Sequence, residues 1–256
     1  MLTSSEKDWI FISDAHFTGR EPEEIETFLR FLDLEKDRIG YFVILGDLFE
    51  FFFGFNGSSS KNGTCPFPEY LPILERLQML HRRGIRIKYF EGNHDFFLHS
   101  FFSQQFGMDI EVYPESYEER LEGKRTFIAH GDLSNPNQWR YRIFRRILKH
   151  PGTYRLIHFV GPRISRRVAE RMSDLSYQKS HNEAQATPPP AFKTFARRKF
   201  LEGFEVVILG HSHFPEELVE WIDGKRYVYF NVGDWKTRRS FLRFIPPDHF
   251  QLERFA

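Results

Sequence analysis

Short apolar runs recur along the chain, and two stretches of helical periodicity separate the first of them. Five runs have the length and the β-branched or aromatic content of buried strands: residues 9–13, 41–45, 85–90, 126–129 and 206–209. Between the early runs, residues 21–36 and 69–83 carry apolar side chains at every third or fourth position, as amphipathic helices do. This alternation predicts β-α-β units and a largely parallel sheet.

Beyond residue 216 the pattern changes to one strand after another. Residues 218–222 and 226–232 flank Asp223 and Gly224, a pair that favours a two-residue hairpin turn. Further strand patterns continue to Ala256. We therefore expect an α/β fold in which two sheets pack face to face and helices cover their outer faces.

A long, mainly helical segment interrupts the strand pattern between residues 134 and 200. Near its end, Thr187 is followed by three prolines, which cannot continue a helix and return the chain to the sheet. We interpret residues 134–200 as a helical cap inserted into a core formed by residues 1–133 and 201–256.

The composition is that of a globular protein without a strong electrostatic bias. The 256 residues are 41% hydrophobic, and 36 basic against 35 acidic side chains leave a formal charge of +1. No global field therefore favours nucleic acid as a partner. No segment has the length of a membrane span or the pattern of a secretory signal, so we expect a cytoplasmic protein. Cys65 is the only cysteine, which excludes an internal disulfide and a thiolate metal site.

Five short polar motifs directly follow the predicted strands. They are Asp14-Ala15-His16, Gly46-Asp47, Gly92-Asn93-His94-Asp95, His130-Gly131-Asp132 and Gly210-His211-Ser212-His213. Each motif alone is a weak signal, since a single histidine or aspartate at a strand end is more often a cap than a ligand. Together they indicate one site, because ligands of α/β sheets gather at the carboxyl ends of the strands.

The side chains of these motifs suit divalent cations. Carboxylate, amide and imidazole groups bind manganese, iron or zinc without a thiolate. In an extended segment, the spacing of Asp14 with His16, and of His211 with His213, would place alternate side chains on one face. Asp47 follows a glycine that allows close approach, so we expect its carboxylate to bridge two cations. Glycines in three of the motifs fit the need for tight turns.

In this order, the motifs resemble those of the calcineurin-like metallophosphoesterase family: Asp-x-His, Gly-Asp, Gly-Asn-His-Asp, a single His and Gly-His-x-His. The resemblance implies a four-layer α/β/β/α sandwich, into which this chain inserts the helical cap. It also implies two divalent metal ions. One would be bound by Asp14, His16, Asp47 and His213, and the other by Asp47, Asn93, His130 and His211.

The implied chemistry is hydrolysis at phosphorus. Two cations about 3.5–4 Å apart lower the pKa of water and hold the attacking and leaving oxygens of an in-line displacement. In the family, the histidine that matches His94 contacts the substrate phosphate or assists the leaving group. We therefore expect His94 to be catalytic, with Asp95 orienting its imidazole; the alternative is that His94 is only a turn residue.

Positive charge is concentrated in the predicted cap. Residues 139–172 contain ten Lys or Arg residues and a single acid, Glu170. A tryptophan and two isoleucines recur every fourth residue from 139 to 147, and a second apolar run follows between 157 and 168. Such basic helices can lie at an anionic membrane surface or guide an amphiphilic phosphorylated substrate, and the alternative is a solvated helical hairpin. The candidate substrate contacts are Arg140, Arg145, Arg146, Lys149 and Arg167.

A closer resemblance is to the UDP-2,3-diacylglucosamine hydrolases of lipid A biosynthesis. They share the stretch from Gly46 to Glu50, the Gly-Asn-x-Asp-Phe and His-Gly-Asp motifs, and a basic helical cap before the final Gly-His-x-His. The resemblance implies cleavage of the diphosphate to UMP and 2,3-diacylglucosamine 1-phosphate, with manganese as the usual cofactor. It also implies two acyl chains enclosed between cap and core, and a peripheral position on the inner membrane. Members often have arginine where this chain has His94.

Two other hypotheses differ in class. The chain would be a metallophosphoesterase that acts on a soluble nucleotide or phosphodiester, or a binding scaffold that kept the fold without catalysis. The first is distinguished by hydrolysis of generic phosphate esters without UMP release from the lipid. The second predicts gaps among the metal ligands, and the sequence has none.

Overall fold

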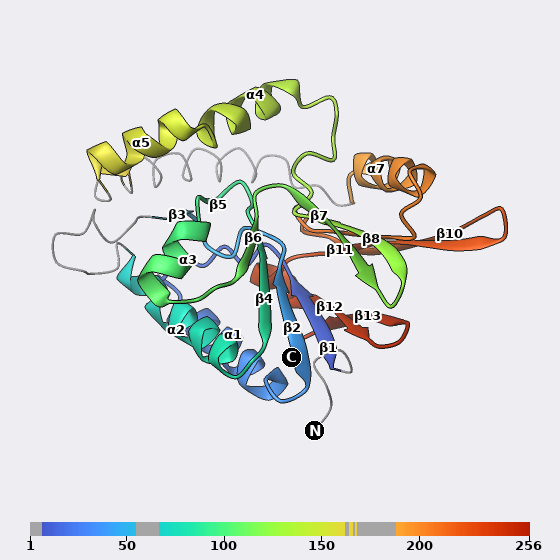
Figure 1. Cartoon of the computed structure of the whole chain (residues 1–256), viewed down its shortest axis with the longest axis horizontal. Helices are drawn as coiled ribbons and strands as arrows, with labels where there is room; N and C mark the ends of the chain where they lie inside the picture. Colours follow the sequence, from blue (N-terminus) through green and yellow to red (C-terminus); the bar gives the residue numbers. More distant parts are fainter. Residues whose placement is uncertain (1–6, 55–66, 162–163, 166, 168–187) are drawn as a thin grey trace.

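The computed structural model describes residues 7–54, 67–161, 164–165, 167 and 188–256, and two sheets form its centre (Figure 1). The larger sheet has the strand order β13-β12-β1-β2-β4-β6. Its strands are β1 (Asp8–Ile12), β2 (Ile39–Ile44), β4 (Arg86–Phe90), β6 (Glu111–Tyr113), β12 (Ser240–Ile245) and β13 (His249–Arg254). Strands β1, β2, β4 and β6 are parallel, and β12 and β13 extend the sheet in antiparallel pairing beside β1.

The second sheet has the strand order β10-β11-β9-β8-β7. Its strands are β7 (Ser116–Leu121), β8 (Lys124–Ala129), β9 (Val206–Leu209), β10 (Pro215–Ile222) and β11 (Lys225–Val232). The predicted hairpin is β10 and β11, in which Ile222 pairs with Lys225 across Asp223 and Gly224. Both turn residues have positive φ, 50° and 76°, as a two-residue hairpin turn of this kind requires.

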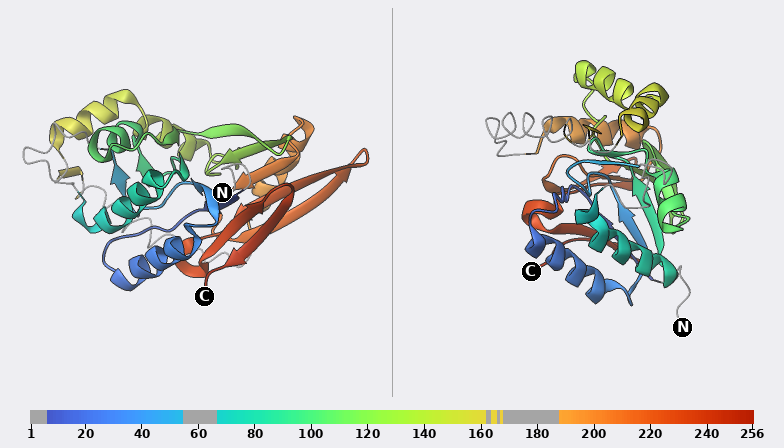
Figure 2. Two further views of the ribbon diagram at one scale, coloured as in Figure 1. Left: turned by 60° about the horizontal axis from the view of Figure 1, so that its bottom comes forward. Right: turned by 90° about the vertical axis from the view of Figure 1, so that its left-hand side faces the viewer.

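Helices cover the outer face of each sheet, and two further helices, α4 and α5, lie above the sheets. They are α1 (Pro22–Glu35), η3 (Pro68–Tyr70), α2 (Leu71–Arg82), α3 (His99–Phe106), α4 (Trp139–Leu148), α5 (Pro151–Val160), α7 (Pro190–Leu201) and α8 (Trp235–Arg238). Helices α1, α2 and α3 pack against the six-stranded sheet, and α7 packs against the five-stranded sheet (Figure 2). The layers therefore follow the predicted order of helix, sheet, sheet and helix.

Alternate side chains of β1 show how the layers are held together. Ile10 and Ile12 belong to the cluster that faces α1 and α2, and Trp9 and Phe11 belong to the cluster between the two sheets. Successive side chains of a strand point to opposite faces, so this strand must be apolar on both. The continuous apolar run in the sequence reflects that double burial.

The boundary of the predicted cap requires a correction at its C-terminal end. Phe192, Ala196 and Phe200 recur every fourth residue on α7 and are buried against Val207 and Tyr229 of the five-stranded sheet. Since α7 forms a layer of the core, we propose that the core resumes at Pro190 rather than at residue 201. The cap is then represented in the described residues by α4 and α5, which lie together at the top of Figure 1.

Arg243 on β12 is a buried cation whose removal tests the electrostatics of the large sheet. Its side chain is 3% exposed and binds Glu35 at 2.9 Å, Asp8 at 3.1 Å and Glu253 at 2.6 Å. Arg243→Met keeps the apolar stem but leaves three clustered carboxylates without their counter-charge. We expect it to lower the free energy of unfolding in urea by about 2 kcal/mol, since the carboxylates remain partly solvated.

Arg83→Met is the matched control for that change. Arg83 pairs with Asp37 at the surface, where both side chains are well exposed, so its loss should cost less than about 0.5 kcal/mol. Equal destabilisation by the two substitutions would contradict the claim that the buried ion pairs of Arg243 stabilise the fold more than the surface pair of Arg83 does.

Candidate metal centre

The five polar motifs leave the carboxyl ends of β1, β2, β4, β8 and β9, as predicted. Backbone hydrogen bonds join the loops, for example from the Asp14 N–H to the Gly46 carbonyl at 3.2 Å and from the Gly210 N–H to the His130 carbonyl at 2.8 Å. The loops therefore form one connected rim. Side chains from distant parts of the sequence are brought to a single edge of the two sheets.

The local conformation of the Asp-x-His and His-x-His motifs differs from the expected extended segment. Asp14 and His16 have φ of 53° and 48°, and His211 and His213 have φ of 65° and 61°. A left-handed conformation is unfavourable for such residues, and it persists where the surrounding structure holds a functional site in place. Alternate side chains still converge, but through tight turns rather than through an extended strand.

Close backbone approach explains two of the motif glycines. A Cβ at residue 92 would clash with the carboxylate of Asp47, and one at residue 210 would clash with the Ser13 side chain. Only Gly46 among these three has a positive φ, 84°. The expectation of tight turns therefore holds at Gly46, while the other two glycines make room for neighbouring side chains.

One half of the site is formed by Asp14, Asp47, His130 and His211. Each offers a ligand atom, and these atoms all lie within 4.8 Å of one another. The His130 Nε2 atom is 3.3 Å from Asp47 Oδ2 and 3.1 Å from His211 Nδ1. The amide oxygen of Asn93 is 3.2 Å from the same nitrogen. Carboxylate, amide and imidazole donors thus point at a common volume.

The other half is formed by His16 and His213 with the same pair of aspartates. Asp14 Oδ1 lies 3.4 Å from His213 Nε2 and 3.8 Å from His16 Nε2. Asp47 Oδ2 lies 4.0 Å from His16 Nε2, so this carboxylate faces histidines of both halves. All seven predicted ligands are therefore brought together, and Asp14 as well as Asp47 adjoins both halves.

Several donor atoms of the site have no hydrogen-bond partner. Among the described residues, Asp14 Oδ1 and His16 Nε2 are buried and unpaired. An unsatisfied buried polar atom costs about 1–3 kcal/mol, which a bound ion would recover. The donor set contains no sulfur and suits manganese, iron or zinc. The residues present thus fit a pair of divalent cations.

Charges within the site shift the pKa of its members in opposite directions. Burial acts to lower the pKa of His130, but the Asp47 carboxylate outweighs it and raises the pKa to about 10. Burial, together with the positive charge of His130, lowers the pKa of His211 to about 4. Although burial opposes ionisation of Asp14 and Asp47, the neighbouring histidines hold the pKa of both carboxyls below the usual range. Both carboxylates are anionic and would be neutralised by bound cations.

Two supporting carboxylates are absent from the residues predicted from sequence. Glu50 lies 3.3 Å from His16 Nδ1, and Asp234 lies 3.5 Å from His213 Nδ1. Carboxylates in these positions orient metal-binding imidazoles and raise their basicity. Asp234 also caps α8 by accepting the Arg238 N–H at 2.8 Å. The only sequence signals were the position of Glu50 just after Gly46-Asp47 and the N-cap character of Asp234.

The predicted role of Asp95 is wrong. Its carboxylate accepts hydrogen bonds from the backbone N–H groups of Asp47, Leu48 and Gly92 and from the Tyr89 hydroxyl. It therefore fixes the loop that presents Asp47 and does not bind the His94 imidazole. Burial and the nearby Asp47 raise the pKa of Asp95, which the hydrogen bonds partly offset.

Asp95→Asn tests this positioning role. The amide nitrogen of asparagine would face backbone donors that now bind a carboxylate, so the Asp47 loop should shift. Substitution of a residue that positions a metal ligand typically lowers metal affinity by about 10–100-fold. We therefore expect about a tenfold loss of Mn²⁺ affinity, measured by isothermal titration calorimetry. An unchanged Mn²⁺ affinity in a folded Asp95→Asn protein would refute the role.

His94 lies beside the metal centre, close to His16 and Asp47. Its Nδ1 atom is 2.6 Å from the Glu50 carbonyl oxygen, and its backbone N–H donates to Asp47 Oδ1 at 2.8 Å. Its ring lies 4.8 Å from that of His16, between centroids. Glu50, rather than Asp95, thus orients the imidazole, and the ring lies beside His16 and Asp47.

The candidate substrate contacts on the cap divide into two groups. Arg145 is buried, with ion pairs to Asp132 and Glu115, and Lys149 binds the Glu91 and Pro114 carbonyls at 3.3 and 3.1 Å. These two side chains attach α4 to the core, which corrects their assignment as substrate contacts. Arg140, Arg146 and Arg167 are exposed, and they remain candidates.

Comparison with known proteins agrees with this site. A family model described as calcineurin-like phosphoesterase matches residues 9–215. The UDP-2,3-diacylglucosamine hydrolase of Tolumonas auensis is 30% identical over 244 residues, covering 91% of this chain and 92% of that protein. The protein of the same name from Yersinia enterocolitica is 30% identical and covers 96% and 98%.

A solved structure shares the fold at low sequence identity. The dimetal phosphatase from Danio rerio is 14% identical, with a TM-score of 0.50, and the alignment covers 97% of this chain and 95% of that one. The family match spans most of the chain and includes the five motifs of the metal centre. The chain therefore belongs to the calcineurin-like phosphoesterases and is a metal-dependent phosphoester hydrolase.

Proposed function

We propose that this chain hydrolyses the diphosphate of UDP-2,3-diacylglucosamine to UMP and 2,3-diacylglucosamine 1-phosphate, a step of lipid A biosynthesis. The observation that carries the proposal is the complete ligand cluster beneath a cap that presents apolar side chains. Relatives that bear this name align with nearly the whole chain at 24–30% identity. Both the catalytic centre and the cap are therefore within the aligned region.

We assign the metal ligands in two sets that share Asp47. Asp14, His16 and His213 complete the first set, and Asn93, His130 and His211 complete the second. Bound divalent cations, for which we propose manganese ahead of iron or zinc, would activate water and neutralise charge on the phosphate. Asp47 Oδ2 faces both His16 and His130, so this carboxylate would be shared by the two metal positions.

His94 is proposed to contact the phosphate and to assist the leaving group. Its Nδ1 atom is bound to a carbonyl oxygen, which requires a proton there and leaves Nε2 for a substrate oxygen. In the imidazolium form, Nε2 can donate to a phosphate oxygen or to the leaving group. Glu50 holds the ring in this orientation through its backbone carbonyl.

The cap is proposed to place the enzyme on the cytoplasmic face of the inner membrane. The large apolar side chains of the cap that are exposed are Trp139, Ile143, Phe144, Ile147, Leu156, Phe159 and Ile164. Because Arg145 and Lys149 bind the core, the apolar stripe of α4 faces away from it, with Arg140 and Arg146 exposed nearby. Apolar side chains flanked by cations are typical of helices that insert into an anionic lipid surface. Among the described residues, no helix is long and apolar enough to cross a membrane.

The substrate is tested by comparing two hydrolysis reactions of the purified chain loaded with Mn²⁺. We expect UMP release from UDP-2,3-diacylglucosamine to exceed hydrolysis of a generic aryl phosphate at the same concentration. Asp109→Asn, a change at an exposed carboxylate that belongs to none of the five motifs, should leave both rates unchanged. UMP release at background level with active ester hydrolysis would instead assign the enzyme to soluble nucleotides or phosphodiesters.

A further inference from the structure

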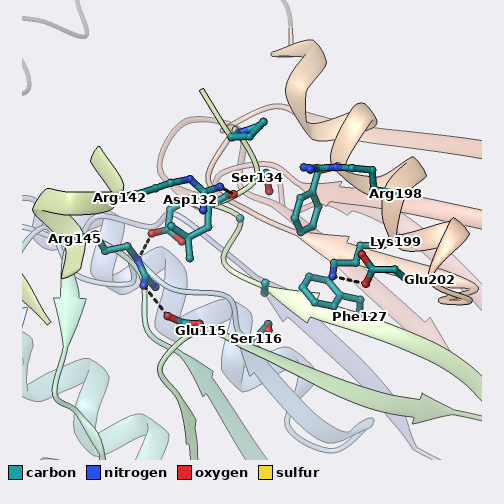
Figure 3. A pocket seen from close by; sticks show the side chains of 15 residues that line it. Glu115, Ser116, Phe127, Asp132, Ser134, Arg142, Arg145, Arg198, Lys199 and Glu202 are labelled. Atoms are coloured by element: carbon teal, nitrogen blue, oxygen red, sulfur yellow. Dashed lines mark hydrogen bonds and ion pairs between the residues drawn. The ribbon is translucent and has the colours of Figure 1, made fainter. Parts of the chain in front are cut away.

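A cavity of about 600 Å³ lies beside the metal centre, between β8, α4 and α7 (Figure 3). Gly131 and Asp132, which follow the proposed ligand His130, line both this cavity and a smaller one that reaches His211. None of the seven proposed metal ligands lines the larger cavity. Its volume is in the range of cavities that bind small molecules.

Two arginines at this cavity have no carboxylate partner among the described residues. Arg142 donates from Nη2 to the Leu133 and Asn135 carbonyls, and Arg198 lies over the Phe195 ring at 5.7 Å. The acids of the lining are already engaged: Asp132 and Glu115 bind Arg145, and Glu202 binds Lys199. The cavity therefore presents two guanidinium groups whose charge is not balanced locally.

The cavity also contains unpaired polar atoms and aromatic side chains. Ser134 is 1% exposed and its Oγ has no hydrogen-bond partner, and Arg142 Nε is likewise buried and unpaired. Figure 3 shows Ser134 between Arg142 and Arg198. A phosphate group suits two guanidinium forks and a hydroxyl, because it accepts several charge-assisted hydrogen bonds at once. Phe127 and Phe195 line the remaining space and would pack against an apolar or aromatic part of a ligand.

We propose that this cavity is a second anion site, which binds a phosphorylated small molecule of nucleotide size. The phosphate would lie between Arg142 and Arg198 beside Ser134, and the rest of the molecule would lie against Phe195. Binding there requires no metal ion and does not depend on the identity of the hydrolysed substrate. The site adjoins the metal centre through Asp132, which is held by Arg145 and by the Tyr141 hydroxyl at 2.7 Å.

The test uses the full chain after metal removal, with UMP and inorganic phosphate as probes in isothermal titration calorimetry. We expect both probes to bind, and UMP to bind more tightly because of the aromatic side chains. Arg198→Gln should lower the affinity for both UMP and phosphate by about tenfold, which is the usual effect of losing one charge-assisted contact. Phe195→Leu should lower the affinity for UMP and leave the affinity for phosphate unchanged.

Arg197→Gln is the matched control, because Arg197 precedes Arg198 on α7 but pairs with Glu220 at 2.6 Å. It should change either affinity by less than about twofold, as expected for a surface pair. Binding that survives Arg198→Gln would place the anion elsewhere and overturn the proposal. An equal loss in both arginine variants would show a general charge effect, and a UMP affinity no better than that of phosphate would refute a nucleotide-sized ligand.

Discussion

Asp47→Asn is expected to lower the rate of hydrolysis by at least about a thousandfold while the protein remains folded. One oxygen of Asp47 accepts the backbone N–H groups of Asn93 and His94, and an asparagine oxygen can keep these bonds. The other oxygen faces His130 and His16 and would lose its charge. Metal ions contribute several kcal/mol of charge stabilisation at phosphorus, so loss of the shared ligand should have this magnitude.

The measurement combines turnover with metal content by inductively coupled plasma mass spectrometry. The Asp47→Asn protein should retain less than its full complement of two cations. Asp109→Asn, which removes an exposed carboxylate, should retain both rate and metal content. Activity within tenfold of the parent in a folded Asp47→Asn protein would mean that this carboxylate does not join the two metal positions.

Replacing Trp139, Ile143 and Ile147 together with serine is expected to weaken vesicle binding by at least about 100-fold. Trp139 is 60% exposed and Ile147 is 61% exposed, so their removal should not unfold α4. Each such side chain contributes roughly 1.5–3 kcal/mol when it is fully transferred from water to an apolar phase. Vesicles of mixed phosphatidylethanolamine and phosphatidylglycerol provide the anionic surface, and co-sedimentation measures the bound fraction.

A second triple variant controls for the loss of exposed apolar area. Leu34, Leu201 and Trp221 are exposed on α1, α7 and β10, so replacing them with serine removes one tryptophan and two aliphatic side chains elsewhere. This variant should bind vesicles like the parent, and both should hydrolyse a small soluble ester at the parental rate. Equal loss of vesicle binding in the two variants would contradict docking through the cap.

The strand ends were predictable because two independent patterns coincide there. Apolar runs located the strands, and polar motifs followed each run directly, so the topology of a parallel sheet brought the motifs together. The convergence of the motifs followed from that rule, and the assignment of seven ligands to two metal positions came from the family resemblance. Asp14 and His211 are thus joined, with the His211 N–H bound to Asp14 Oδ2 at 2.7 Å, although almost 200 positions separate them.

The supporting contacts were not predictable, because they depend on which loops happen to face each other. Asp95 is adjacent to His94 in sequence, but its carboxylate turns to the loop after β2, where the N–H groups of Asp47 and Leu48 donate to it, and also accepts the Gly92 N–H. Glu50 and Asp234 approach their histidines only in the folded chain. Neighbouring positions in sequence do not determine the direction of side chains in a tight turn.

The cap shows why periodicity alone does not give orientation. The stripe from Trp139 to Ile147 predicted an amphipathic helix correctly, but not which face turns to the core. Arg145 decides it, because the buried Asp132 and the Pro114 carbonyl provide partners that the sequence does not reveal. The apolar face of α7 instead turns toward the core, because Phe192 and Phe200 pack against apolar side chains of the five-stranded sheet.

The most direct test of the two-metal centre is an anomalous difference map from a crystal of the chain soaked in Mn²⁺. We expect two peaks about 3.5–4 Å apart, with Asp47 between them, His16 and His213 at one peak and His130 and His211 at the other. A single peak, or peaks remote from these side chains, would contradict a paired-cation mechanism.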